Sequence, residues 1–208
     1  MKFDDYKDCT KCPDLYKLRT QIVWGYGNEQ CDVMFIAEGP GEHEDAEGVP
    51  FRGESGILLD QLLEEAGIDR EEVYITNSVL CRPTRPSAAG HGLVNRPPTK
   101  LEVENCLPRL RREILAINPK IVVSLGDVAA SALVGKKLGI KKSRGKMLDV
   151  YIRTDNGVVV PYAVMPVFHP AYLLRTRSQE EIRRTVWDLR LVINVLSRYK
   201  ASMDTAHV

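Results

Sequence analysis

The sequence predicts an α/β protein: a three-layer α/β/α sandwich around a central, mainly parallel sheet of four strands. Two observations support this expectation. Segments with helical periodicity or capping signals separate a series of short apolar runs, and such alternation favours helices packed on both faces of a parallel sheet. The runs are apolar or rich in β-branched residues, as buried strands are, and they occupy residues 33–37, 73–79, 121–125 and 163–168.

The chain has the composition of an ordinary globular protein. Of its 208 residues, 44% are hydrophobic and 27% are charged, and the net charge is +1, so overall charge does not require a nucleic-acid partner. We expect one domain over residues 1–200 and a flexible tail over residues 201–208. No apolar run reaches membrane-spanning length and the N-terminus does not resemble a signal peptide, so we expect a cytoplasmic monomer without membrane contact.

The amino-terminal half contains two strand–loop units. Residues 38–53, rich in Gly, Pro and acidic residues, follow the first strand and precede a helix with one apolar face at residues 55–66. Open α/β sheets bind their ligands at the carboxyl ends of the strands, so this loop is a candidate site. Asn77, near the end of the second strand, should face the same edge. A capping box at Thr99 and Glu102 then opens the next helix.

The carboxyl-terminal half repeats the alternation of strands and helices. Asp127 follows the third strand and can cap a short helix. Basic side chains gather in the next loop, residues 136–146, where a solvated surface is the simplest interpretation. Residues 150–160 predict a hairpin with a tight turn around Asp155-Asn156-Gly157. His169 then ends the last core strand, and an amphipathic helix closes the fold.

Four of the five cysteines predict a metal site. Cys9 and Cys12 are separated by two residues, a spacing that lets both thiolates point at one centre. Cys81 and Cys106 flank a long loop and complete a set of four. Four thiolates suit either structural zinc or an iron–sulfur cluster, and the residues alone leave both open. Cys31 has no nearby partner and is expected to be a plain buried thiol.

Several motifs occur in a fixed order along the chain. They are EGPGxxED at residues 38–45, GxPFxG at 48–53, Asn77, CRP at 81–83 and HPAYLLR at 169–175. This ordered set, with the four cysteines, resembles the family 4 uracil-DNA glycosylases, which contain an iron–sulfur cluster. The resemblance covers nearly the whole chain. It implies a DNA repair enzyme that flips uracil out of DNA and hydrolyses its N-glycosidic bond to leave an abasic site.

The resemblance assigns residues to a uracil pocket. Phe51 would supply a flat face for stacking, and the Asn77 amide would offer an acceptor for uracil N3–H and a donor for O4. Glu44 would lie near the C5 edge and exclude the thymine methyl group. Gly39 and Gly41 belong to the same substrate-binding loop. The alternatives are a core aromatic for Phe51, a structural asparagine at a strand end, and a solvated acidic residue for Glu44.

Three residues are implied in catalysis. His169 would stabilise negative charge on uracil O2 as the bond breaks, with its protonation state left open. Glu38 would orient the attacking water and stabilise the cationic sugar, and Asn95 competes for the water-binding role. The residues expected to contact DNA, by insertion into the stack or by gripping phosphate, are Leu173, Leu174, Arg175, Arg144 and Lys146; for the basic ones an ordinary exposed side chain is the alternative.

The same resemblance implies a 4Fe-4S cluster on Cys9, Cys12, Cys81 and Cys106, and uracil-containing DNA, single- or double-stranded, as partner. An alternative function is a capture protein that stays covalently or tightly bound to the abasic product. A related subgroup carries a histidine at the place of Asn95 and is trapped in this way; here His91 lies four residues earlier. A small-molecule hydrolase or nucleotide-binding protein is disfavoured, because GxxxxGK[ST] and GxSxG motifs are missing from the sequence.

Overall fold

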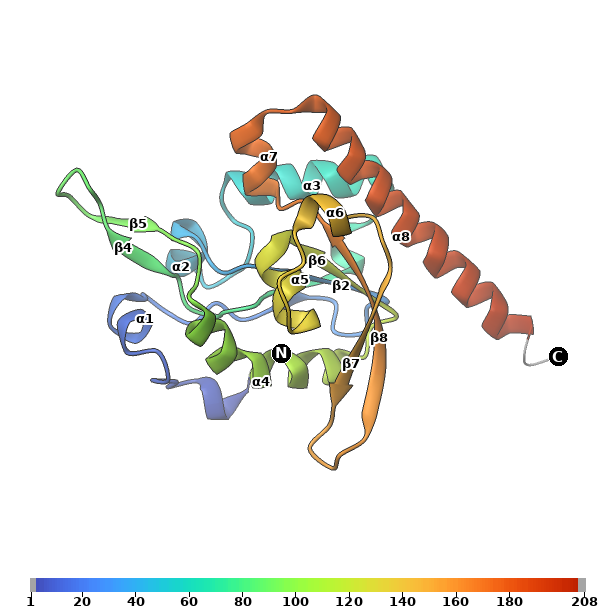
Figure 1. Cartoon of the computed structure of the whole chain (residues 1–208), viewed down its shortest axis with the longest axis horizontal. Helices are drawn as coiled ribbons and strands as arrows, with labels where there is room; N and C mark the ends of the chain where they lie inside the picture. The colour runs from blue at the N-terminus through green and yellow to red at the C-terminus, as the bar shows by residue number, and fades with distance from the viewer. Residues whose placement is uncertain (1–2, 206–208) are drawn as a thin grey trace.

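A mixed six-stranded sheet forms the centre of the protein, in a computed structural model that describes residues 3–205 and the side chains of residues 3–202 (Figure 1). Its middle consists of four parallel strands in the order β3, β2, β6, β8, and an antiparallel strand lies at each edge, β1 beside β3 and β7 beside β8. The strands are β1 (Tyr26–Gly27), β2 (Val33–Ala37), β3 (Tyr74–Asn77), β6 (Ile121–Leu125), β7 (Leu148–Arg153) and β8 (Val159–Val167).

The expected α/β class with a mainly parallel sheet is confirmed, but the expected number of four strands is wrong. The four predicted strands are the four parallel ones. The predicted hairpin at residues 150–160 is confirmed by the pairing of β7 with β8. It adds β7 to the sheet, because β8 continues without a break from Val159 to Val167. At the other edge, only two residues of β1 pair with β3, too few to give a sequence signal.

The parallel strands are buried on both faces, as their continuous apolar runs predict. Along β2, Phe35 packs into a core with helices α3 (Glu54–Ala66) and α8 (Gln179–Thr205). The alternate residues Met34 and Ile36 pack into a second core with helices α4 (Lys100–Ile117) and α5 (Gly126–Val134). Because strand side chains alternate between faces, one strand supplies both cores, and helices cover both sides of the sheet.

Helix α4 has the predicted capping box at its start and a proline in its interior. The capping box is present: Thr99 Oγ1 accepts the Glu102 N–H, and Glu102 accepts the Thr99 N–H at 2.7 Å. Pro108 lies inside the helix, which nevertheless runs unbroken to Ile117. The remaining helices are η1 (Asp4–Tyr6), α1 (Pro13–Leu18), α2 (Glu42–Glu47), η2 (Arg70–Glu72), α6 (Ile140–Ser143) and α7 (Pro170–Thr176).

A second, small sheet lies in the loop between Cys81 and Cys106. Strands β4 (Thr84–Pro86) and β5 (Leu93–Asn95) pair antiparallel and project from the body as a hairpin. Arg96 fixes its base by donating to the Thr84 carbonyl at 2.9 Å and to both carboxylate oxygens of Glu102 at 2.6 and 2.8 Å. These hydrogen bonds attach the base of the hairpin to the start of helix α4.

Helix α8 is long and extends beyond the body of the molecule in Figure 1. Residues 201–205 of the expected tail are helical and belong to α8, and residues 206–208 lie outside the described residues. Among the described helices, none is both long enough and apolar enough to cross a membrane.

Candidate active site

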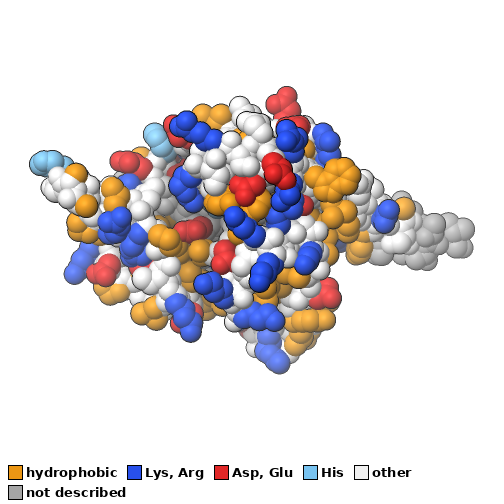
Figure 2. Space-filling model, turned by 45° about the horizontal axis from the view of Figure 1, so that its top comes forward, with side chains coloured by type: hydrophobic (Ala, Val, Ile, Leu, Met, Phe, Trp, Pro, Cys, Tyr) orange, Lys and Arg blue, Asp and Glu red, His pale blue; other side chains and the backbone are white. Residues whose placement is uncertain are grey.

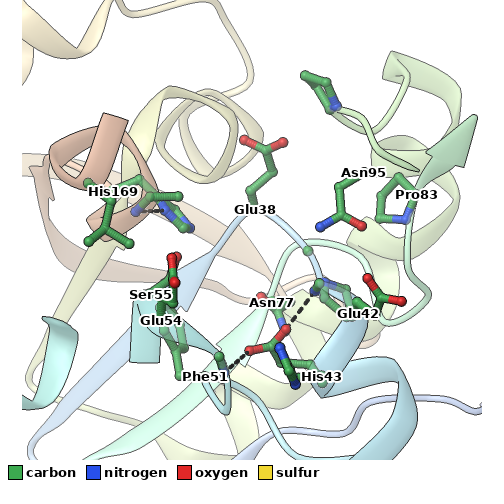
Figure 3. Close-up of a pocket in the computed structure, with 18 of the residues that line it drawn as sticks. Glu38, Glu42, His43, Phe51, Glu54, Ser55, Asn77, Pro83, Asn95 and His169 are labelled. Atoms are coloured by element: carbon green, nitrogen blue, oxygen red, sulfur yellow. Dashed lines mark hydrogen bonds between the residues drawn. The ribbon is translucent and has the colours of Figure 1, made fainter. Parts of the chain in front are cut away.

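A cleft of about 800 Å³ opens at the carboxyl edge of the parallel strands (Figure 3). Glu38 directly follows β2, Asn77 ends β3, and His169 follows β8 by two residues. The cleft contains every residue predicted for catalysis and base binding, so residues far apart in sequence meet at one site as expected for parallel strands. These lining residues are Glu38, Gly39, Gly41, Glu44, Phe51, Asn77, Asn95 and His169.

The buried carboxylate of Glu44 holds two parts of the opening loop together. One oxygen accepts the Gly41 N–H at 2.9 Å, and the other accepts the N–H groups of Arg52 at 2.7 Å and Gly53 at 3.0 Å. A side chain at position 41 would collide with this carboxylate, because a Cβ there would lie 2.6 Å from Glu44 Oε2. Both oxygens of Glu44 are thus engaged in ordering the loop that forms one wall of the cleft.

Phe51 lies on this wall in an uncommon conformation. Its φ of +59° is in the left-handed region, which non-glycine residues rarely adopt. Its ring stacks near His169, with ring centroids 6.0 Å apart and planes inclined by 26°. The flanking N–H groups of Arg52 and Gly53, bound to Glu44, fix the backbone that carries the ring. Such strain, held by surrounding bonds, is typical of functional sites.

His169 is a neutral hydrogen-bond donor in this site. It caps helix α7, and its Nδ1 accepts the Ala171 N–H at 3.1 Å. That bond requires an unprotonated Nδ1, so Nε2 carries the hydrogen. Burial, with a further contribution from Arg175, lowers the pKa of His169 to about 4. The protonation state that the sequence left open is therefore the neutral one at physiological pH.

Glu38 lies in the cleft between His169 and Asn95, as Figure 3 shows. Burial raises the pKa of its carboxyl group, and the positive charge of Arg175 acts in the opposite direction. A partly desolvated carboxylate of this kind is a better proton acceptor than one in water.

Asn95 extends over the cleft from the end of β5. Its Oδ1 accepts a hydrogen bond from Arg82 Nε at 2.7 Å, which fixes the orientation of the amide. The amide NH₂ group is then the part available to the cleft, near Gly41. Arg82, which also approaches Glu42 at 3.4 Å, is a positioning residue that the motif analysis did not identify, because its partner is thirteen residues away in sequence.

Helix α7 divides its predicted DNA contacts between two faces. Leu173 is buried in the core with α3 and α8, so its expected role in contacting DNA is wrong. Leu174 and Arg175 are exposed and line the cleft. Because a helix turns about 100° per residue, only part of a run of consecutive residues can face outward.

The two basic residues predicted from the 136–146 loop also differ. Arg144 is mostly buried; it pairs with Asp188 at 2.6 Å and donates to the Arg184 carbonyl. These contacts fix the loop to α8, so the structure does not support Arg144 as a free phosphate contact. Lys146 is exposed. Figure 2 shows many Lys and Arg side chains on the face that it presents. Within the 136–146 segment, Lys136, Lys137, Lys141, Lys142 and Lys146 are exposed.

Comparison with known proteins places these features in a family. A sequence model of the uracil DNA glycosylase superfamily matches residues 24–194. The chain is 45% identical to the type-4 uracil-DNA glycosylase of Thermotoga maritima, over 86% of this chain and 84% of that protein. It is 38% identical to the type-4 enzyme of Saccharolobus solfataricus, over 97% and 88%.

The chain belongs to the uracil-DNA glycosylase superfamily. The expected enzyme class, an N-glycosylase of DNA repair, is thereby confirmed. Identity to a type-5 uracil-DNA glycosylase of Pyrobaculum aerophilum is lower, 28% over 79% of this chain and 83% of that protein. The similarity therefore favours the type-4 group that the motifs indicated.

The four cysteines predicted as ligands line one small cavity of this glycosylase. Donors surround three of their sulfur atoms: Arg19 donates to Cys81 Sγ at 3.2 Å, and Asn105 donates to Cys12 Sγ at 3.4 Å. Arg109 lies beside the third, Cys106. Burial raises the pKa of the Cys81 thiol to about 11. Cys31 is buried in a core away from the cavity, as expected.

Within the described part of the chain, no three Cys, His, Asp or Glu side chains converge closely enough to bind one ion. By residue type, four cysteines lining one cavity suit either structural zinc or an iron–sulfur cluster. Hydrogen bonds to the sulfurs are a usual feature of such sites.

We expect Glu44→Gln to loosen the loop over residues 41–53, because an amide offers one acceptor oxygen where the carboxylate offers two. The free energy of unfolding should fall by about 1–3 kcal/mol, measured with denaturant, and amide exchange at Gly41, Arg52 and Gly53 should accelerate. The matched control is Glu47→Gln in the same helix, whose carboxylate is half exposed. Equal exchange in the two variants would contradict this role of Glu44.

The lowered pKa of His169 predicts a specific pH dependence of stability. Between pH 6.5 and 4 the unfolded chain binds a proton at this histidine and the folded chain does not, so stability is lost as pH falls through that window. We expect the stability of the unmodified chain relative to His169→Gln to decrease by roughly 3 kcal/mol across it. Denaturant unfolding of both proteins at several pH values measures this; a constant difference would disprove it.

Proposed function

We propose that this glycosylase extrudes uracil from DNA into the cleft and hydrolyses its glycosidic bond with the residues described above. The observation that carries the proposal is the neutral Nε2–H of His169, held in one cleft with the carboxylate of Glu38 and the amide of Asn77. The three groups supply what the reaction needs: stabilisation of the leaving base, a proton acceptor for water, and recognition of uracil.

Base recognition rests on Asn77 and Phe51. The buried Asn77 amide can accept from uracil N3–H and donate to O4, whereas cytosine presents the opposite pattern. Phe51 offers its ring as a stacking face on the same wall. Glu44, whose oxygens are bound to three backbone N–H groups, acts by fixing this wall. It can exclude the thymine methyl group only through the volume it occupies.

Bond cleavage uses His169 as a hydrogen-bond donor and Glu38 as a proton acceptor. As the bond from C1′ to uracil N1 breaks, its electron pair moves onto the base, and His169 Nε2–H stabilises the charge at O2. Water then bonds to C1′, and Glu38 accepts its proton while stabilising the cationic sugar. The Asn95 NH₂ group is suited to hold the same water by donating to its oxygen. Glu38 and Asn95 thus act together on one water.

Contacts with DNA are assigned to α7 and the basic face. Leu174 is the apolar side chain suited to occupy the space left by the extruded base, and Arg175 beside it can bind phosphate. Lys146 adds charge on the same face. These contacts suit single- and double-stranded DNA alike, and we propose that a single domain, acting as a cytoplasmic monomer, makes them.

We further propose that Cys9, Cys12, Cys81 and Cys106 hold a 4Fe-4S cluster. When bound, the cluster would pin the N-terminal segment to the base of the hairpin, beside the cleft. The shared cavity and the donors aimed at the sulfurs support this assignment. No cleavage step requires the cluster.

Turnover is favoured over capture of the abasic product by the position of His91. It is exposed in the turn between β4 and β5, beyond the paired residues, whereas Asn95 at the base of the hairpin lines the cleft. A histidine at the hairpin tip cannot attack the sugar without refolding the hairpin.

An assay on a uracil-containing oligonucleotide tests the proposed reaction. We expect alkali-labile cleavage at uracil and no heat-stable shifted band on a denaturing gel. His169→Leu should lower kcat by about 10²–10³-fold through loss of the donor, and His91→Leu should retain full activity. An uncleaved strand with the unmodified chain would refute glycosylase activity, and a shifted band lost in His91→Leu would establish capture instead.

Visible absorption and iron content of the freshly purified protein test the cluster. We expect brown protein with about four irons per chain. Cys81→Ser should lose both signals, and Cys31→Ser, a buried thiol outside the cavity, should keep them. Colourless protein containing zinc would exclude the cluster.

A further inference from the structure

Arg109 is a fully buried guanidinium between the cysteine cavity and the floor of the cleft. It pairs with Glu113, also fully buried, at 2.5 Å. The Glu113 carboxylate additionally accepts the hydroxyl groups of Tyr74 at 2.9 Å and Thr76 at 3.0 Å. Desolvating two charges is costly, and apolar residues of similar size often serve stability as well. Stability alone therefore does not explain why this pair of charged residues is buried here.

Toward the cleft, Arg109 holds the end of β3. Its Nη2 donates to the carbonyl of Asn77 at 2.7 Å and to the carbonyl of Ser78 at 3.2 Å. Asn77 is the residue whose amide we assign to reading uracil, and its side chain lines the cleft. A guanidinium with donors in a rigid fork fixes both carbonyls, and with them the direction in which the Asn77 side chain points.

On the side of the cysteines, Arg109 interacts with Cys106. Its Nε is buried and has no hydrogen-bond acceptor at bonding geometry in the described part of the chain. Cys106 lies one helical turn earlier on α4, close enough for its sulfur to act on the guanidinium charge. A sulfur bound to iron is a permanent thiolate and accepts hydrogen bonds. A loaded cavity would therefore turn the neighbouring Cys106 sulfur into a charged acceptor for the Arg109 guanidinium.

The chain segment after Asn77 connects the same two places. Val79 lines the cysteine cavity. The N–H groups of Ser78 and Val79 donate to the carbonyls of Ala37 at 2.8 Å and Glu38 at 3.3 Å. Any shift of this segment thus reaches the backbone of the carboxylate assigned to the water as well as that of Asn77.

We propose that Arg109 is a positioning residue that ties the ligated sulfur of Cys106 to the main chain of Asn77, so that loading of the cysteine site sets the geometry in which uracil is read. The proposal rests on the proposed function, both for the role of Asn77 and for the cluster. A purely structural Arg109–Glu113 pair would stabilise the core equally with or without iron. The two roles therefore differ in what iron removal does to residues 77–79.

Arg109→Lys separates these roles. Lysine keeps a positive charge for Glu113, but a compact ammonium on a flexible stem cannot span Glu113, the β3 carbonyls and Cys106 together. Arg112→Lys is the matched control, on the same helix and in an exposed pair with Asp5. We expect Arg109→Lys to raise KM for uracil-containing DNA by about 10-fold or more with a smaller change in kcat, and the control to change neither.

Amide hydrogen exchange supplies a readout independent of activity. In the iron-loaded chain we expect protection of the Ser78 and Val79 amides. Chelation of the iron should accelerate their exchange by about 10-fold or more while the amides of β6 stay protected. In Arg109→Lys the two amides should exchange rapidly even with iron bound.

Clear results would overturn the proposal. If iron removal leaves the amide exchange rates of Ser78 and Val79 in the unmodified chain unchanged, the cysteine site is not coupled to this segment. This result does not depend on whether a variant folds. Equal behaviour of Arg109→Lys and Arg112→Lys, or loss of protection throughout β6, also excludes coupling. An unmodified chain that releases no uracil would instead refute the proposed function, whatever the exchange pattern shows.

Discussion

Parallel pairing of four strands is the constraint on which the site depends. Because β3, β2, β6 and β8 run in one direction, all four end at the same edge and each contributes there. Gly126, after β6, has a φ of +88°, and a Cβ on it would lie 3.1 Å from the His169 Cβ. A slip of β8 by one residue would move His169 by about 3.3 Å and turn its side chain to the other face.

Arg175 links the electrostatics of the two catalytic candidates. Its positive charge lowers the pKa of both Glu38 and His169, while burial raises the first and lowers the second. On balance the pKa of His169 is lowered and the pKa of Glu38 is raised. One exposed residue of α7 thereby acts electrostatically on two groups of the cleft.

The sequence predicted the parallel strands and the residues at their ends because burial and strand direction follow from local patterns. It did not predict β1, of which only two residues pair with β3. It predicted the hairpin that contains β7, but not that this hairpin is part of the sheet. It placed Leu173 and Leu174 together because a motif carries no helical orientation. The roles of Glu44, Arg82 and Arg144 were also inaccessible, because each depends on a hydrogen-bond partner that only the folded chain brings near.

The β4–β5 hairpin has a consequence for protein engineering. Strand pairing and Arg96 fix its base, so a change in the turn over residues 87–92 should leave the position of Asn95 unchanged. Lengthening a surface loop adds only a slowly growing entropic cost, about 0.6 kcal/mol for each doubling. A reporter peptide or a tether to a second protein could therefore be built into this turn, which contributes no lining residue to the cleft.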